Sequence, residues 1–147
     1  MGEPVEEELL SLYLAEHRDL PNPVTHLRLG QPRGFSKSNP AGAQQRRLFL
    51  STLPEADLVT RDRATATIYE FAIWRPQTKV GQLIVYGKLL PETPGYFDLS
   101  EDQVELVLVN AEVNSRVKEI AAEMLIDYEL FQPKSVLEKV AARRGGS

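Results

Sequence analysis

Two acidic residues on neighbouring predicted strands are the strongest candidates for chemistry in this sequence. Asp57 lies near the start of one predicted strand, and Glu70 lies in the middle of the next. Neighbouring strands can bring two such carboxylates close together, and divalent cations such as Mg²⁺ prefer carboxylate oxygens as ligands. The pair therefore predicts a site for one Mg²⁺ or Mn²⁺ ion, with Asp57 and Glu70 as its metal ligands.

Three further polar residues lie on the predicted helix that follows the second strand. Lys79, Gln82 and Tyr86 are spaced at three- and four-residue intervals. Residues at this spacing lie on one side of a helix, so the three side chains can face the same partner. We therefore add them to the two carboxylates as candidate site residues.

In this order along the chain, the residues resemble the PD-(D/E)XK nuclease family, whose motif is an Asp at a strand start, then Glu-x-Lys in the next strand, with a helix behind. Gln82-x-x-x-Tyr86 is similar to the motif of the RecB-like exonuclease branch. The resemblance covers roughly residues 54–131 and implies a restriction-endonuclease-like αβββαβ core. It implies that Asp57 and Glu70 bind the metal ion, and that the Gln and Tyr brace the site or the nucleic-acid strand.

The lysine of the family motif is missing, because Ala72 stands at its position. In the family that lysine orients and activates the attacking water and offsets charge at the scissile phosphate, which a methyl group cannot do. Lys79 is the local candidate for a displaced lysine, although its place in a first helical turn is equally that of an ordinary surface lysine. Arg75 is a poorer substitute because a guanidinium stays protonated.

Three hypotheses about function follow from these residues. The first is a catalytically degenerate nuclease-fold domain that acts as a nucleic-acid-binding or assembly module, of a kind that suits a phage or mobile-element protein, including a virion component. The second is an active Mg²⁺-dependent nuclease that uses Asp57, Glu70 and Lys79. The third is a structural protein whose carboxylates are exposed strand residues and whose motif match is accidental.

Composition limits these hypotheses further. The 147 residues are 42% hydrophobic and 26% charged, which fits one globular domain. The absence of cysteine excludes disulfides and cysteine-based zinc sites and is compatible with a reducing cytoplasm. No apolar run approaches the roughly 20 residues that span a bilayer. The net charge of -4 gives no global attraction to nucleic acid, so any such contact must be concentrated.

One such concentration is the segment over residues 30–46, which is rich in Gly, Pro and Ser and is expected to be a mobile loop. It is the most basic stretch before the C-terminal end, and it contains no acid. We expect the basic residues of this segment, and the arginine that follows it, to contact a nucleic-acid backbone or a protein partner. These residues are Arg33, Lys37, Arg46 and Arg47.

Hydrophobic periodicity predicts an α/β fold with a mixed central sheet flanked by helices. Helices are expected over residues 4–18, 76–90 and 135–142, and after a cap at Asn114 or Ser115. Strands are expected over residues 24–29, 47–52, 56–61, 66–74, 104–109 and 126–131. The nuclease-like domain is expected over residues 1–132, and residues 133–147 are expected to form a tail with a disordered end.

Two other features have a chemical and a structural interpretation. The acids Glu6, Glu7 and Glu8 interact favourably with the dipole of the first predicted helix, or supply an outer metal ligand. The two histidines, His17 and His26, have no neighbours in the sequence that suggest a catalytic triad or a zinc site, so both are interpreted as structural.

Overall fold

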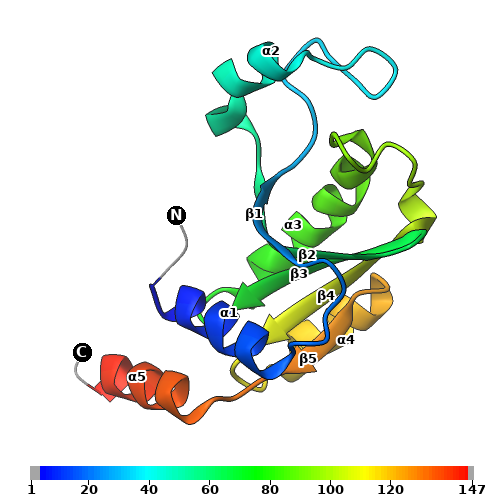
Figure 1. The fold of residues 1–147 in the computed structure, drawn as a ribbon. Helices are drawn as coiled ribbons and strands as arrows, with labels where there is room; N and C mark the ends of the chain where they lie inside the picture. Colours follow the sequence, from blue (N-terminus) through cyan, green and yellow to red (C-terminus); the bar gives the residue numbers. More distant parts are fainter. Residues whose placement is uncertain (1–3, 146–147) are drawn as a thin grey trace.

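The computed structural model describes residues 4–145, which fold around one five-stranded sheet (Figure 1). The helices are α1 (Pro4–Glu16), α2 (Ala43–Leu48), α3 (Pro76–Leu89), α4 (Ser115–Glu123) and α5 (Lys134–Gly145). The strands are β1 (Val24–Arg28), β2 (Glu55–Asp62), β3 (Thr65–Ala72), β4 (Val104–Asn110) and β5 (Asp127–Leu130). Three short 3-10 helices are η1 (Leu50–Thr52), η2 (Leu90–Glu92) and η3 (Glu101–Gln103).

The sheet is mixed, with the strands in their sequence order β1-β2-β3-β4-β5. The first three strands form an antiparallel meander, whereas β4 and β5 are parallel to β3. Parallel neighbours need a long crossover, and α3 and α4 supply the two that this sheet requires. The predicted α/β class, the mixed sheet flanked by helices and the αβββαβ core are therefore confirmed.

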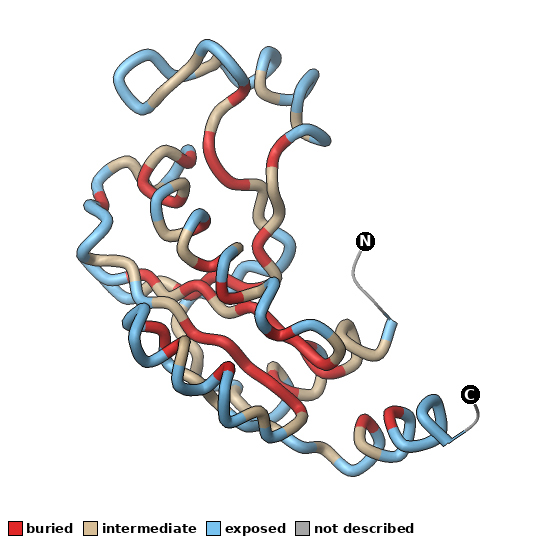
Figure 2. Tube along the Cα trace, turned by 180° about the vertical axis from the view of Figure 1, so that it is seen from behind, coloured by how far each residue is buried: buried red, intermediate tan, exposed pale blue. Residues whose placement is uncertain are grey.

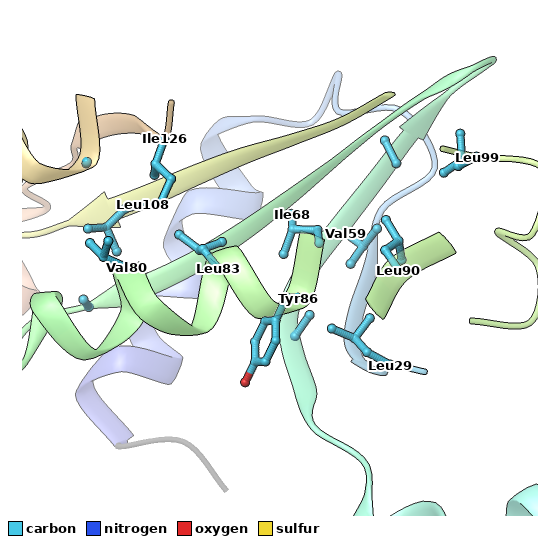
Figure 3. Close-up of a cluster of buried hydrophobic side chains, with 14 of the residues drawn as sticks. Leu29, Val59, Ile68, Val80, Leu83, Tyr86, Leu90, Leu99, Leu108 and Ile126 are labelled. Atoms are coloured by element: carbon cyan, nitrogen blue, oxygen red, sulfur yellow. The ribbon is translucent and has the colours of Figure 1, made fainter. Parts of the chain in front are cut away.

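One face of the sheet is covered by α3 and α4, which enclose the first apolar cluster (Figure 3). The stripe of α3 that faces the sheet includes Val80 and Leu83, and Leu90 of η2 continues it; all three are buried. Across from them lie Ile68 of β3 and Leu108 of β4, both fully buried. This apolar stripe thus fixes α3 against the strands that carry the candidate site.

The opposite face of the sheet is covered by α1 and α5, which enclose the second apolar cluster. Tyr13 of α1 meets Phe71 of β3 edge to face, with ring centroids 5.3 Å apart. From α5, Val136 and Val140 are buried in the same cluster, and they give this helix its two buried positions in Figure 2. The C-terminal helix therefore packs against α1 and the second apolar cluster.

This packing changes the expectation for the C-terminal end. The short helix expected over 135–142 extends to Gly145, so Arg143 and Arg144 are helical and not part of a disordered end. Residues 146 and 147, which were expected to be disordered as well, lie outside the described residues. A domain limit at residue 132 stays a prediction, and the buried valines of α5 are a reason to extend the domain.

The strand expected over residues 47–52 is wrong, because the chain forms α2 and then η1 there. Local hydrogen bonds explain the difference: the Gly42 N–H donates to Gln45 Oε1 at 2.9 Å and starts α2. The apolar run at Leu48 and Phe49 is exposed and has no strand to pair with. A run this short does not distinguish a helix from a strand by periodicity.

The segment expected as a mobile loop lies beside α2 and stands off from the sheet (Figure 1). Its start is fixed to η2 and the following residue, because the Gly30 N–H donates to Thr93 Oγ1 at 2.8 Å and Gln31 donates to the Glu92 carbonyl at 3.1 Å. Mobility of residues 30–46 stays a prediction. None of the helices within residues 4–145 is both long and apolar enough to cross a membrane.

The packing of α5 yields a stability prediction. Val136→Ala should lower the free energy of unfolding by roughly 2 kcal/mol, because two methyl groups leave a fully buried site. Val113→Ala is the matched control, since that valine is 71% exposed and should change stability by less than about 0.5 kcal/mol. Urea denaturation followed by circular dichroism measures both. Equal, small effects would mean that α5 is not part of the folded unit.

Candidate active site

Asp57 and Glu70 lie side by side on β2 and β3, in the register that pairs Leu58 with Tyr69. Each carboxylate accepts a hydrogen bond from the backbone of the neighbouring strand. The Asp57 N–H donates to Glu70 Oε2 at 2.7 Å, and the Phe71 N–H donates to Asp57 Oδ2 at 2.9 Å. The carboxylates therefore converge, as a metal site requires, and the sheet itself holds them in place.

Lys79 brings a positive charge to this pair from the first turns of α3. Its Nζ lies 3.6 Å from Glu70 Oε1 and 3.8 Å from Asp57 Oδ2. The Lys79 side chain is only 21% exposed, so its position is not that of a solvated surface lysine. The structure thus brings together the three residues that the displaced-lysine hypothesis needs.

Ala72, at the position of the family lysine, is fully buried in the cluster beneath α3. It lies two residues after Glu70 on the same strand, so both side chains are on the α3 side of the sheet. The amine that lies near the carboxylate pair is that of Lys79, on the helix that packs over this face.

Burial sets the protonation of the carboxylate pair. Burial, and next the charge of Asp57, raises the pKa of Glu70 to about 8, against the opposing effect of Lys79. Burial also raises the pKa of Asp57 above its ordinary value, although Lys79 and the Phe71 N–H oppose this shift. Burial works against the charge of Lys79, but the two carboxylates outweigh it and raise its pKa. Glu70 is therefore largely protonated at neutral pH without a bound cation.

Tyr86 and Gln82 are the remaining candidate site residues, and they are buried to different degrees. Tyr86 is buried in the first cluster, and its hydroxyl points away from the apolar side chains (Figure 3). Burial, and then the charges of Glu70 and Asp57, raises the pKa of Tyr86 to about 12, so its hydroxyl stays a proton donor near these carboxylates. Gln82 is half-buried on the same helix.

A histidine beside the site was missed by sequence reasoning. The register of β1 with β2 places His26 opposite Asp57, and its backbone has a φ of 55°, which is left-handed. Its ring contacts Glu55 at 2.7 Å and Glu7 at 3.3 Å. These neighbours are distant in sequence, so no spacing in the chain could have indicated the cluster.

The other acids of the first helix hold elements together. Glu6 Oε2 accepts the Ile73 N–H at 3.0 Å, just after the end of β3. Glu8 accepts a hydrogen bond from Ser135 at 2.9 Å and pairs with Lys139, so it ties α1 to α5. These contacts explain both side chains without a metal ligand role.

The four basic residues expected to contact nucleic acid lie on or near α2, away from the carboxylates. Arg46 donates to the Arg28 carbonyl at 2.8 Å, and burial lowers its pKa, so it supports the chain fold locally. Lys37 donates to the Leu99 carbonyl at 3.4 Å. Arg33 and Arg47 are exposed. Lys37 is exposed too, but its amine is bonded to that carbonyl, so Arg33 and Arg47 are the most accessible to a partner.

The donor set suits a hard divalent cation that is completed by other ligands. Within residues 4–145, no group of three or more His, Cys, Asp or Glu side chains is arranged to hold a metal ion. Mg²⁺, however, is commonly held by one or two carboxylates together with waters and substrate phosphates. Asp57 and Glu70 fit that pattern, so a bound cation would depend partly on the substrate.

Comparison with known proteins finds solved structures with a similar fold. No protein-family model matches the sequence, and neither does any curated protein sequence. A repair endonuclease from Pyrococcus abyssi is similar in structure, with a TM-score of 0.50 and 14% identity over 90% of this chain and 50% of that chain. A complex of EndoMS with dsDNA2 also has a TM-score of 0.50, with 16% identity over 90% of this chain and 47% of that chain.

The chain thus spans about half the length of these endonuclease chains. At such low identity the similarity concerns the fold. What this chain shares with these endonuclease structures is an α/β fold, which in this chain is a five-stranded mixed sheet with helices on both faces.

Proposed function

We propose that this protein is a divalent-metal-dependent nuclease in which Lys79 replaces the missing lysine of the family motif. The observation that carries the proposal is the position of Lys79 Nζ, within 3.8 Å of both carboxylates. A lysine side chain held there by the ordered helix α3 can act on the same phosphate as a lysine on β3. The proposal therefore favours the second sequence hypothesis over a degenerate site.

Each residue of the site has a defined part in the proposed reaction. Asp57 and Glu70 would hold Mg²⁺ or Mn²⁺, which supplies Lewis acidity and lowers the pKa of bound water. Lys79 stays cationic, because the carboxylates raise its pKa, and offsets the charge that develops on the scissile phosphate. The Tyr86 hydroxyl, kept protonated, can donate a hydrogen bond to the site or to the bound strand.

We propose double-stranded DNA as the substrate to be tested first. One structural neighbour is a repair endonuclease, and the other is a complex with dsDNA2. On this chain, the exposed Arg33 and Arg47 offer contacts to a phosphate backbone beyond the site. Placement in the RecB-like exonuclease branch is a narrower proposal, supported by Tyr86, whose pKa is raised by burial and then by the charges of Glu70 and Asp57.

A catalytically degenerate binding or assembly module is the second candidate function. The buried Ala72 favours it, because a methyl group stands where the family has its lysine. Under this alternative the protein would bind nucleic acid or a protein partner without cutting. A phage or virion setting stays a prediction from the sequence.

Removal of the Lys79 amine should abolish most cleavage. We expect Mg²⁺- or Mn²⁺-dependent cleavage of DNA by the wild type, and a loss of about 100-fold or more in Lys79→Ala. Lys88→Ala is the matched control on the same helix, because Lys88 is 65% exposed and pairs with Glu101 away from the carboxylates. Labelled single- and double-stranded DNA, resolved on denaturing gels, provides the measurement.

Two results would count against this assignment. Equal cleavage by wild type and Lys79→Ala would remove Lys79 from the mechanism. No cleavage by the wild type with either metal, combined with retained DNA binding, would support the degenerate module instead.

The raised pKa of Glu70 predicts how stability depends on pH without metal. The folded protein keeps this proton up to about pH 8, whereas an ordinary glutamate releases it near 4.5. The folded state therefore binds more protons in this window, and its stability falls as pH rises through it. Glu70→Gln cannot ionise, so it should be more stable than wild type at pH 9, by on the order of a few kcal/mol.

Urea denaturation in EDTA at pH 5 and pH 9 measures this effect. The advantage of Glu70→Gln should shrink toward pH 5, because this pH is close to the ordinary glutamate pKa of 4.5 and keeping the proton in the folded state costs little there. Glu123→Gln, at an exposed position of α4, should show no such pH dependence. An identical stability difference between Glu70→Gln and wild type at both pH values would mean that Glu70 is not protonated in the folded protein.

A further inference from the structure

A pocket of about 350 Å³ lies directly beside Lys79, between α3 and α5. We term it the α3–α5 pocket. It is lined by Glu6, Trp74, Arg75, Thr78, Lys79 and Arg143. Because Lys79 contributes to both the pocket and the carboxylate cluster, an occupant of the pocket would lie next to the proposed reaction centre.

The lining of this pocket favours an anion. Three of its side chains are cationic and one is acidic, in a protein whose net charge is -4. The single acid, Glu6, already accepts a hydrogen bond from the Ile73 N–H. The pocket is therefore a local concentration of positive charge, of the kind that an acidic protein needs in order to bind nucleic acid.

Arg75 is the best placed of these cations to bind a ligand. It is exposed at the N-cap of α3, immediately before Pro76, and among the described residues its side chain makes no ion pair. Its guanidinium offers paired N–H donors that match phosphate oxygens. The Thr78 hydroxyl, in the first turn of the same helix, adds a further donor to the lining.

The opposite wall comes from the C-terminal helix. The Arg143 guanidinium lies over the Trp74 ring at 4.6 Å from its centroid. Arg144, the next residue, forms a bidentate ion pair with Glu112 at 2.5 and 2.7 Å, which fixes the end of α5. The indole Nε1 of Trp74 is buried and has no acceptor within the described part of the chain.

We propose that the α3–α5 pocket binds a phosphate group of the nucleic-acid strand, next to the phosphate that is cut. This proposal rests on the proposed nuclease function, because that function gives the neighbouring Lys79 its scissile phosphate. The phosphate has two possible sources, the 5′-terminal group of a strand or an internal phosphodiester. Arg75 of the α3 N-cap and Arg143 of α5 are the guanidinium groups that bind it.

Trp74 is the single tryptophan of the chain, so its fluorescence reports on this pocket directly. Matched short single-stranded oligonucleotides, with a 5′-phosphate or a 5′-hydroxyl, are titrated into the wild type in EDTA and low salt, where no cleavage occurs. The bound phosphate should change the Trp74 emission. Arg75→Gln should weaken binding by about threefold to tenfold, because one charge-assisted contact is lost.

Arg116→Gln is the matched control, since Arg116 is an exposed arginine in the first turn of α4 and outside the pocket. It should bind like the wild type to within about twofold. Tighter binding of the 5′-phosphorylated strand, with the preference lost in Arg75→Gln, identifies a terminal phosphate. Equal binding of both strands, weakened by Arg75→Gln, identifies an internal one.

The proposal is overturned if both oligonucleotides leave the Trp74 emission unchanged, or if Arg75→Gln and Arg116→Gln weaken binding equally. Because the titration needs neither metal nor cleavage, its result is separate from that of the Lys79→Ala assay. Cleavage that depends on Lys79 but not on Arg75 would keep the nuclease and discard the pocket.

Discussion

The structure depends on the placement of two carboxyl groups side by side within a largely buried part of the sheet. Glu70 is 1% exposed, and its neighbour Asp57 approaches it across the strand pair. Two charges of one sign in such a place destabilise the fold unless a proton or a cation compensates them. The raised pKa of Glu70 and the adjacent Lys79 are the two forms of that compensation that the chain itself provides. A divalent ion would be a third.

The remaining elements serve this placement. The antiparallel pairing of β2 with β3 sets the two carboxyls opposite each other, and backbone N–H groups hold one oxygen of each. Helix α3 returns over the same face, and the burial of Leu83 and Leu90 fixes its position and thus that of Lys79. On the far face, α1 and α5 seal the sheet, and α5 brings Arg143 to the edge of the site. The same strands and helices therefore form the apolar core and position the residues of the site.

Much of the fold could be predicted because its signals are local. The stripe at Val80 and Leu83 predicts α3, and the alternation in β3 predicts which residues share a face with Glu70. The failures have equally physical causes. At residues 47–52 the short apolar run suggested a strand, but the capped helix α2 and a 3-10 turn form there. Near the C-terminus, composition suggested a disordered end, but the burial of two valines orders α5. The cluster at His26 joins three elements, so only tertiary structure reveals it.

The proposed nuclease activity requires that Asp57 and Glu70 bind a divalent ion with Lys79 beside them, although Ala72 stands at the position of the family lysine. The most direct test is anomalous diffraction from crystals of the protein soaked in Mn²⁺. A Mn²⁺ peak is expected between the two carboxylates, with Lys79 Nζ still beside them. Soaked crystals that show no Mn²⁺ at this position would contradict the proposed metal site.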